Sequence, residues 1–296
     1  MMPADRAGLN FRQDYFDDPA GWAAIKSLLY DIFSVDLDPL DSVGGYDRTS
    51  FPSAFFDESG RCIANLSGFA MPLIIDGRPV KAAGWQSGAV RPDYRGLGLF
   101  RALIRHTLQR GEEQGFEAVV LYTDKPGLYA PHGFRTVRQF SFRGDAPRPI
   151  GGQKPARRLT IESDLGLLQR LLAKRTPVSQ RLAVTGQAEM FLLNCHLVED
   201  VSLSLMPDEK TVVAWRMTDG GAFQLLDVVG EQVPCLAEIL GALDLTPASV
   251  ETFIPPDRLA FDGEPVGDDG PLVLMMRCAD DLLPTEPCCL SPLAEF

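Results

Sequence analysis

Residues 90–103 read VRPDYRGLGLFRAL, and this stretch decides the fold prediction. Apolar residues precede it over 78–90 in a pattern typical of a strand, and apolar residues recur at helical spacing over 98–114. The glycines between these two segments predict a tight turn that leads from the strand directly into the helix. Such a turn places the free backbone N–H groups of a helix N-terminus where a ligand can reach them.

The chemistry of this turn favours an anion. The helix dipole adds partial positive charge at the N-terminus, and the side chains of Arg91, Arg95 and Arg101 could add full charges nearby. Gly96 and Gly98 lack the Cβ atoms that would keep a phosphate away from the backbone. The residues therefore predict a site for a pyrophosphate group.

Two common phosphate-binding motifs do not fit the turn. A Walker A loop needs Gly-Lys followed by Ser or Thr, and this sequence is absent from residues 90–103. A dinucleotide fingerprint needs a third glycine, but Arg101 stands at that position after Gly96 and Gly98.

The turn resembles the signature of the GNAT superfamily of N-acetyltransferases, which is Gln or Arg, two residues, Gly, one residue, and Gly or Ala. The matching residues here are Arg95, Gly96, Leu97, Gly98, Leu99 and Phe100, with Phe100 where Gly or Ala is commoner. The stretch GLYAPHGF at 127–134 matches a second block of the family through Tyr129, Gly133 and Phe134. The resemblance covers residues 15–140, and the region before the turn further resembles a bacterial branch with an accessory C-terminal region.

The resemblance implies acetyl-CoA as the donor and an amine as the acceptor, which attacks the thioester directly. Residues 95–100 would hold the pyrophosphate, and the backbone of Ala89 and Val90 would bind the pantetheine arm or the thioester oxygen. Tyr129 would be the general acid for the departing thiolate. A thiol pKa of ~8.5 against ~10 for tyrosine means that the thiolate needs little help, so the hydroxyl should aid turnover without being essential. No metal is implied.

The general base is left open by the sequence. Many relatives carry a carboxylate on the strand before the turn, but KAAGWQSGAV at 81–90 has none, and Gln86 and Ser87 stand at the plausible positions. Asp47, the C-terminal carboxylate of Phe296 and a water chain are the alternatives. The missing carboxylate also favours a second hypothesis, in which the chain binds acetyl-CoA as a sensor or scaffold without turnover.

The predicted fold class is α/β (α+β), a GNAT acyltransferase fold with a mixed central sheet and a second, smaller domain. A connector rich in proline and glycine at 143–158 places the boundary between a GNAT domain at 1–148 and a C-terminal domain at 149–296. The second half has a similar order of predicted helices and strands but no Arg-x-x-Gly-x-Gly turn, so we expect a degenerate GNAT-like domain that walls the acceptor cleft.

Charge and cysteine usage narrow the partners. The net charge is −12, with −1 over residues 1–150 and −11 over 151–296. This acidity argues against nucleic acid and anionic membranes and is compatible with a small-molecule or polypeptide amine that is cationic.

The six cysteines form no metal-ligand spacing, and residues 1–16 do not resemble a secretory signal. We therefore expect reduced thiols in the cytoplasm, and the oligomeric state is left open.

Overall fold

The computed structural model describes residues 8–151 and 154–295. In this part of the chain the helices are α1 (Pro19–Phe33), α2 (Asp38–Val43), α3 (Leu99–Glu113), α4 (Ile161–Ala173), α5 (Glu189–Leu197) and α6 (Leu236–Leu243). The strands of the first half are β1 (Leu9–Gln13), β2 (Phe51–Asp57), β3 (Cys62–Ala70), β4 (Leu73–Ile75), β5 (Arg78–Val80), β6 (Ala82–Val90), β7 (Ala118–Thr123), β8 (Arg135–Val137) and β9 (Phe140–Asp145). Those of the second half are β10 (Arg157–Leu159), β11 (Leu182–Val184), β12 (Ser202–Leu205), β13 (Thr211–Met217), β14 (Phe223–Gly230), β15 (Ser249–Thr252), β16 (Glu264–Gly267) and β17 (Val273–Cys278).

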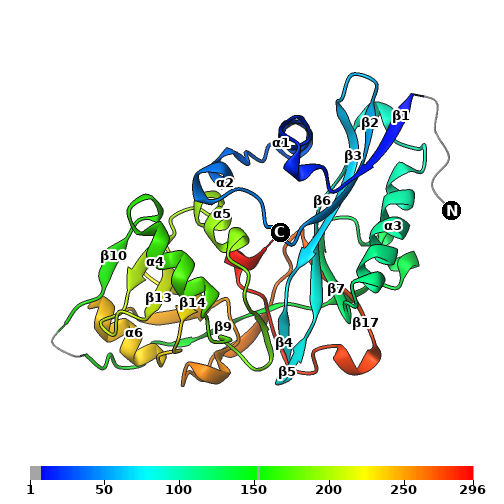
Figure 1. The fold of residues 1–296 in the computed structure, drawn as a ribbon. Helices are drawn as coiled ribbons and strands as arrows, with labels where there is room; N and C mark the ends of the chain where they lie inside the picture. The colour runs from blue at the N-terminus through cyan, green and yellow to red at the C-terminus, as the bar shows by residue number, and fades with distance from the viewer. Residues whose placement is uncertain (1–7, 152–153, 296) are drawn as a thin grey trace.

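The first sheet has the strand order β1-β2-β3-β6-β7-β17-β8. Its neighbours are antiparallel except for β6 and β7, which run parallel and are joined by α3. Helix α3 packs on β2, β3 and β6, whereas α1 packs on the opposite face of β3 and β6 (Figure 1). Leu99, Leu103 and Ile104 of α3 are buried against the sheet, as the helical spacing of the apolar residues predicts.

The second sheet has the order β10-β12-β13-β14-β15-β9-β16 and repeats this plan. Strands β14 and β15 are parallel and are joined by α6, as β6 and β7 are joined by α3. The predicted class, mixed α/β with a second sheet-rich region, is confirmed. The link between β14 and α6 lacks the arginine-flanked glycine turn, and Glu231 stands there instead.

Each half of the sequence contributes one strand to the sheet that the other half mainly forms. Strand β9 lies before the predicted boundary at 148/149, yet it pairs with β15 and β16 of the second sheet. Strand β17 comes from the second half of the sequence and lies between β7 and β8. A small sheet, β11-β4-β5, also joins the halves. The division into domains at 1–148 and 149–296 stays a prediction, but the hydrogen bonding of the sheets crosses it.

The segment 78–90, predicted as one strand, is divided in the structure, and so is the apolar segment 61–75 before it. Segment 61–75 becomes β3 and β4, which are separated at Met71 and Pro72, and segment 78–90 becomes β5 and β6, which are separated at Lys81. The N–H of Met71 still bonds to Ala82 O at 2.9 Å, but Pro72 has no N–H to continue the ladder. Strand β4 then pairs with β11 of the second half.

The C-terminal segment lies between α5 and the first sheet, where it is coloured red in Figure 1. A short 3-10 turn, Pro292–Ala294, packs against α5 and β14. Leu293 and Ala294 are buried, and Asn194 Nδ2 donates to Glu295 O at 2.7 Å. The last described residues are therefore fixed against α5 and β14 of the second sheet.

Candidate functional site

Strands β6 and β7 separate toward their carboxyl ends. Their parallel pairing covers Ala82–Trp85 and Ala118–Leu121, and the rest of β6 pairs only with β3. A β-bulge shifts the β3–β6 register between Asn65 and Ser67, and Ser87 at this point has a left-handed φ of 59°. The bulge bends β6 away from β7, which leaves backbone groups of β6 without a strand partner on that side.

A buried polar network holds the bulge in place. Asn65 Nδ2 donates to Ser87 O at 2.9 Å and to Ser67 Oγ at 3.0 Å, while the hydroxyl of Tyr15 donates to Asn65 Oδ1 at 2.6 Å. Asn65 and Ser67 are fully buried, so each of these bonds replaces a lost contact with water. Sequence reasoning missed this network, although an asparagine inside an apolar strand was a signal for it.

The glycine turn forms as the sequence predicts. Gly96 has φ 79° and Gly98, the N-cap of α3, has φ 69°, both in the left-handed region that glycine adopts without strain. Arg95 Nε donates to Val90 O at 3.3 Å and ties the turn to the end of β6. Arg95 and Arg101 are exposed near the N-terminus of α3.

Arg91 corrects the expectation that three arginines flank the anion site. Its side chain is 4% exposed and points into the fold, where Nη1 pairs with Asp31 Oδ2 at 2.6 Å and Nε donates to Cys62 O at 2.8 Å. Arg91 therefore links α1 to β3. It follows that the positive charge of the turn comes from Arg95, Arg101 and the helix N-terminus.

A cleft of about 750 Å³ lies over this turn and the open end of β6. Seven of the predicted binding residues line it, namely Ala89, Val90, Arg95, Gly96, Gly98, Leu99 and Phe100. Leu97 is half exposed and lies outside this lining. Sequence reasoning missed Ile32 and Phe33 at the end of α1, which wall the cleft, and it also missed Lys125. The cleft thus combines a cationic end with apolar walls, and the binding roles of its residues stay predictions.

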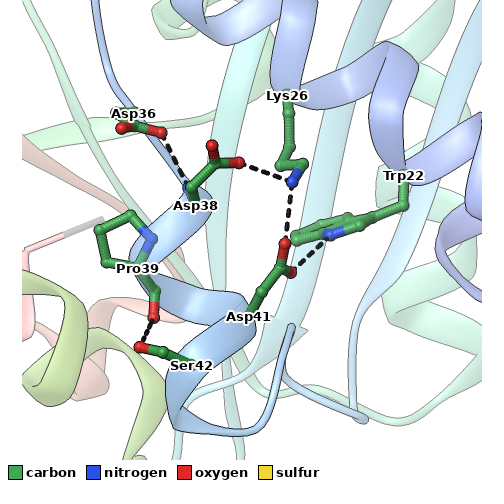
Figure 2. A network of polar contacts seen from close by, with 7 residues as sticks. All are labelled: Trp22, Lys26, Asp36, Asp38, Pro39, Asp41 and Ser42. Carbon is green, nitrogen blue, oxygen red and sulfur yellow. Dashed lines mark hydrogen bonds and ion pairs between the residues drawn. The ribbon is translucent and has the colours of Figure 1, made fainter. Parts of the chain in front are cut away.

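The wall formed by α1 is braced by α2 (Figure 2). Lys26 Nζ donates to Asp38 Oδ1 at 2.7 Å and to Asp41 Oδ2 at 2.8 Å, and Trp22 Nε1 donates to Asp41 Oδ1 at 3.0 Å. The hydrogen bond from Lys26 lowers the pKa of the Asp41 carboxyl. Because these groups are largely exposed, each pair contributes at most about 1 kcal/mol, and the network orients α2 against α1.

Tyr129 lies between two short 3-10 turns, Pro126–Leu128 and Ala130–His132. Its ring is 7% exposed and makes edge contacts with Phe100 and Phe134, with centroids 5.8 Å apart in both pairs. A Cβ added to Gly88 would lie 3.1 Å from its hydroxyl oxygen. Tyr129 is absent from the lining of the cleft but adjoins it through Phe100 and Gly88.

Two titratable groups of this loop have shifted pKa values. Burial, and then the charge of Asp124, raises the pKa of the Tyr129 phenol well above its ordinary value. Burial, and then the charges of Arg101, Arg105 and Arg277, lowers the pKa of His132. The tyrosine is therefore protonated, and His132 lines the cleft.

Asp47, the candidate base that the structure describes, is absent from the lining of the cleft. Asp47 is buried, and its Oδ1 accepts from the N–H and the hydroxyl of Thr49, both at 2.7 Å, which makes it the cap of a turn. The carbonyl of Ser87 is bonded to Asn65 in the bulge. Phe296 lies outside the described residues. Asp47, Phe296 and a water chain thus remain predictions for this role.

A second cavity, of about 290 Å³, adjoins the C-terminal segment and is lined by Arg143, Glu251, Asp268 and Glu295 among others. Glu251 is paired, since it accepts from Arg143 Nε at 2.8 Å and from Gln224 Nε2 at 2.7 Å. Glu295 has no ion-pair partner among the described residues. Burial, and then the charge of Asp268, raises the pKa of the Glu295 carboxyl to about 7. This cavity therefore holds one carboxyl that is close to its midpoint at neutral pH.

Neither a candidate metal-binding cluster nor a helix that could cross a membrane appears in the described ranges. Residues 8–151 and 154–295 hold no group of three or more His, Cys, Asp or Glu side chains that could bind a metal ion. In the same residues, no helix has the length and apolar character needed to cross a membrane.

Comparisons with known proteins bear on this arrangement. A family model described as an acetyltransferase (GNAT) domain matches residues 46–137, which include the glycine turn and Tyr129. A comparison with curated proteins finds no match.

Solved structures share the fold over most of the chain. A probable N-acyltransferase from Enterococcus faecalis has a TM-score of 0.61 at 13% identity. The match covers 91% of this chain and 72% of the Enterococcus faecalis chain. Eis1 from Mycobacterium abscessus has a TM-score of 0.58 at 16% identity, with 92% and 74% covered. A GCN5-related N-acetyltransferase from Kribbella flavida has a TM-score of 0.57 at 18% identity, with 93% and 72% covered. Residues 46–137 thus match a GNAT acetyltransferase domain, and the chain as a whole shares the fold of these solved structures.

Proposed function

We propose that this protein is an N-acetyltransferase that transfers the acetyl group of acetyl-CoA to an amine. The observation that carries the proposal is the 750 Å³ cleft, which brings the left-handed glycine turn, the free end of β6 and the Tyr129 loop together. The turn offers the N–H groups of the α3 N-terminus to a pyrophosphate, with Arg95 and Arg101 beside it. The apolar walls at Ile32, Phe33 and Phe100 suit a pantetheine arm.

In this proposal the amine attacks the thioester carbonyl carbon, and the C–S bond breaks as the tetrahedral intermediate collapses. Backbone groups at Ala89 and Val90 bind the arm or the thioester oxygen. The hydroxyl of Tyr129 donates to the departing thiolate. Because burial keeps this hydroxyl protonated, it stabilises the developing charge by hydrogen bonding and transfers its proton less readily than an exposed tyrosine would.

The acceptor of this proposal is a small-molecule or polypeptide amine with a positive charge. The surplus of acidic residues in the second half supports a cation. The amine must lose a proton before it attacks, and water, Asp47 or the Phe296 carboxylate would accept it. The cysteines at positions 62, 195, 235, 278, 288 and 289 are free thiols, which supports a cytoplasmic location.

The test is a panel of amines with the full chain and acetyl-CoA, with release of the CoA thiol as the readout. The panel includes diamines, polyamines, aminoglycosides and peptides with free N-termini or lysines. Acetylation of at least one cationic member supports the proposal. Binding of acetyl-CoA by calorimetry without transfer to any member would favour a sensor or scaffold, and the absence of binding would overturn both.

A further inference from the structure

Phe100 stands where the glycine turn of related sequences commonly has a small residue, and the structure shows where its side chain goes. Phe100 is the second residue of α3, and its buried neighbours Leu99 and Leu103 fix the helix on the sheet. The ring of Phe100 reaches the bulge, since a Cβ added to Gly88 would lie 3.1 Å from Phe100 Cζ. The ring therefore spans from the first turn of α3 to the bulge of β6.

The orientation of Tyr129 depends on ring packing. No hydrogen bond to its hydroxyl is found among residues 8–151 and 154–295, so a polar contact does not set the direction of the side chain. The ring is held between Phe100, at an interplanar angle of 85°, and Phe134, at 70°. Phe134 belongs to the loop after Tyr129, whereas Phe100 comes from a separate element. Phe100 thus supplies the contact that ties the tyrosine loop to α3.

Gly88 allows Phe100 and Tyr129 to approach the backbone of β6. Tyr129 Oη and Phe100 Cζ would each lie 3.1 Å from a Cβ at position 88, a spacing that real Cβ atoms rarely tolerate. The absence of a side chain there lets the hydroxyl lie directly against the backbone of β6, one residue before Ala89. This is where the proposed function puts the thioester.

We propose that Phe100 is a positioning residue, which holds the hydroxyl of Tyr129 against the backbone at Gly88 so that it faces the thioester sulfur. Phe100 acts through Tyr129, and its contribution is to the rate of transfer more than to the binding of the donor. This inference rests on the proposed function. It assigns a role to the large side chain of Phe100, which the turn motif alone does not explain.

The first test is a double-mutant cycle in the full chain. Phe100→Ala lowers kcat by about the same factor as Tyr129→Phe, in addition to any rise in the KM for acetyl-CoA that follows from the loss of this cleft wall. The double variant shows no further loss, because both changes remove the same interaction. Phe100→Leu, which keeps part of the bulk, recovers part of the rate. Losses that multiply in the double variant, or a loss of donor affinity with kcat unchanged, would overturn the proposal.

The second test needs no turnover and separates this inference from the proposed function. In the ligand-free protein, the ring protons of Tyr129 give a nuclear Overhauser effect to the Gly88 α-protons. Phe100→Ala removes this signal, whereas Phe116→Ala, at a half-buried phenylalanine beyond the other end of α3, retains it. A signal that persists in Phe100→Ala would overturn the positioning role, even in a protein without detectable transferase activity.

Discussion

The hydroxyl oxygen of Tyr129 lies against Gly88, where an added Cβ would come within 3.1 Å of it. Gly88, next to the bulge of β6, and Tyr129, in the loop after β7, are 41 residues apart in sequence and meet at this point. The bulge is fixed by Asn65, and the tyrosine is oriented by two phenylalanines. The geometry places one protonated hydroxyl beside the backbone that ends β6.

Tyr129→Phe is expected to lower kcat by about tenfold to hundredfold, with little change in the KM for acetyl-CoA. The thiolate is a good leaving group, so loss of the hydrogen bond slows its departure without stopping it. The measurement is initial rate by thiol release with the best amine of the panel. Tyr30→Phe, at a ring that is 63% exposed, is the matched control and keeps the wild-type rate. An unchanged kcat in Tyr129→Phe would show that the hydroxyl takes no part.

The dependence of kcat on pH above neutrality is expected to have the same shape in the wild type and in Tyr129→Phe, although kcat is lower in the variant. Burial raises the pKa of this phenol well above its ordinary value, so the hydroxyl stays protonated throughout an assay between about pH 7 and 9.5. The measurement is kcat at saturating substrates across this range. A decline above pH 8 or so that is present in the wild type and absent in the variant would assign an ordinary pKa to Tyr129, contrary to its burial.

A fragment of residues 1–148 is expected not to fold cooperatively. It lacks β17, whose Leu274, Met275 and Met276 are each at most 2% exposed and which separates β7 from β8. Burying three such side chains contributes about 5 kcal/mol or more, which is comparable to the whole stability of a domain. Urea unfolding followed by tryptophan fluorescence measures this, and adding the fragment 149–296 is the control that restores the fold. A cooperative transition in 1–148 alone would mean that the strand exchange is dispensable.

Glu295→Gln is expected to stabilise the protein at high pH and to have a smaller effect at low pH. The folded pKa of Glu295, about 7, lies above its ordinary value of 4.5. As pH rises between these values the unfolded chain loses the proton first, so wild-type stability falls over this window. The variant lacks this loss, which we put at about 1–2 kcal/mol after allowing for partial exposure.

The measurement for Glu295 is urea unfolding at about pH 5.5 and pH 8, with Glu286→Gln at a nearby exposed carboxylate as the control. The gain in unfolding free energy from Glu295→Gln should grow from the lower pH to the higher, and the control should show no such growth. An equal gain at both pH values would contradict a raised pKa.

Much of the fold could be predicted from the sequence because its signals are local. The strand, turn and helix around Gly96 and Gly98 follow from apolar spacing and from the need for left-handed backbone, and α3 begins and ends within one residue of the prediction. Ala89 and Val90 end β6, as the strand pattern over 78–90 predicts. These features depend on residues that are neighbours in sequence.

The features that could not be predicted depend on distant partners. No local pattern shows that β17 pairs with β7 and β8, or that β9 joins the second sheet, because either strand would satisfy its hydrogen bonds equally well elsewhere. Arg91 illustrates the same limit within the site. Its spacing matched an anion-binding residue, but Asp31 and the Cys62 carbonyl bind it inside the fold.

The central claim, that the glycine turn binds acetyl-CoA, is tested most directly by calorimetry of the full chain with a matched pair of variants. Gly96 (φ 79°) and Gly60 (φ 84°, between β2 and β3) share a left-handed backbone and have no atom within 4 Å of an added Cβ. Alanine at either position therefore introduces the same strain, about 1 kcal/mol, and only Gly96→Ala places a Cβ at the proposed pyrophosphate site. The account predicts one acetyl-CoA per chain, a Kd raised by about tenfold or more in Gly96→Ala, and wild-type affinity in Gly60→Ala. No binding by the wild type, or equal affinities in the two variants, would contradict it.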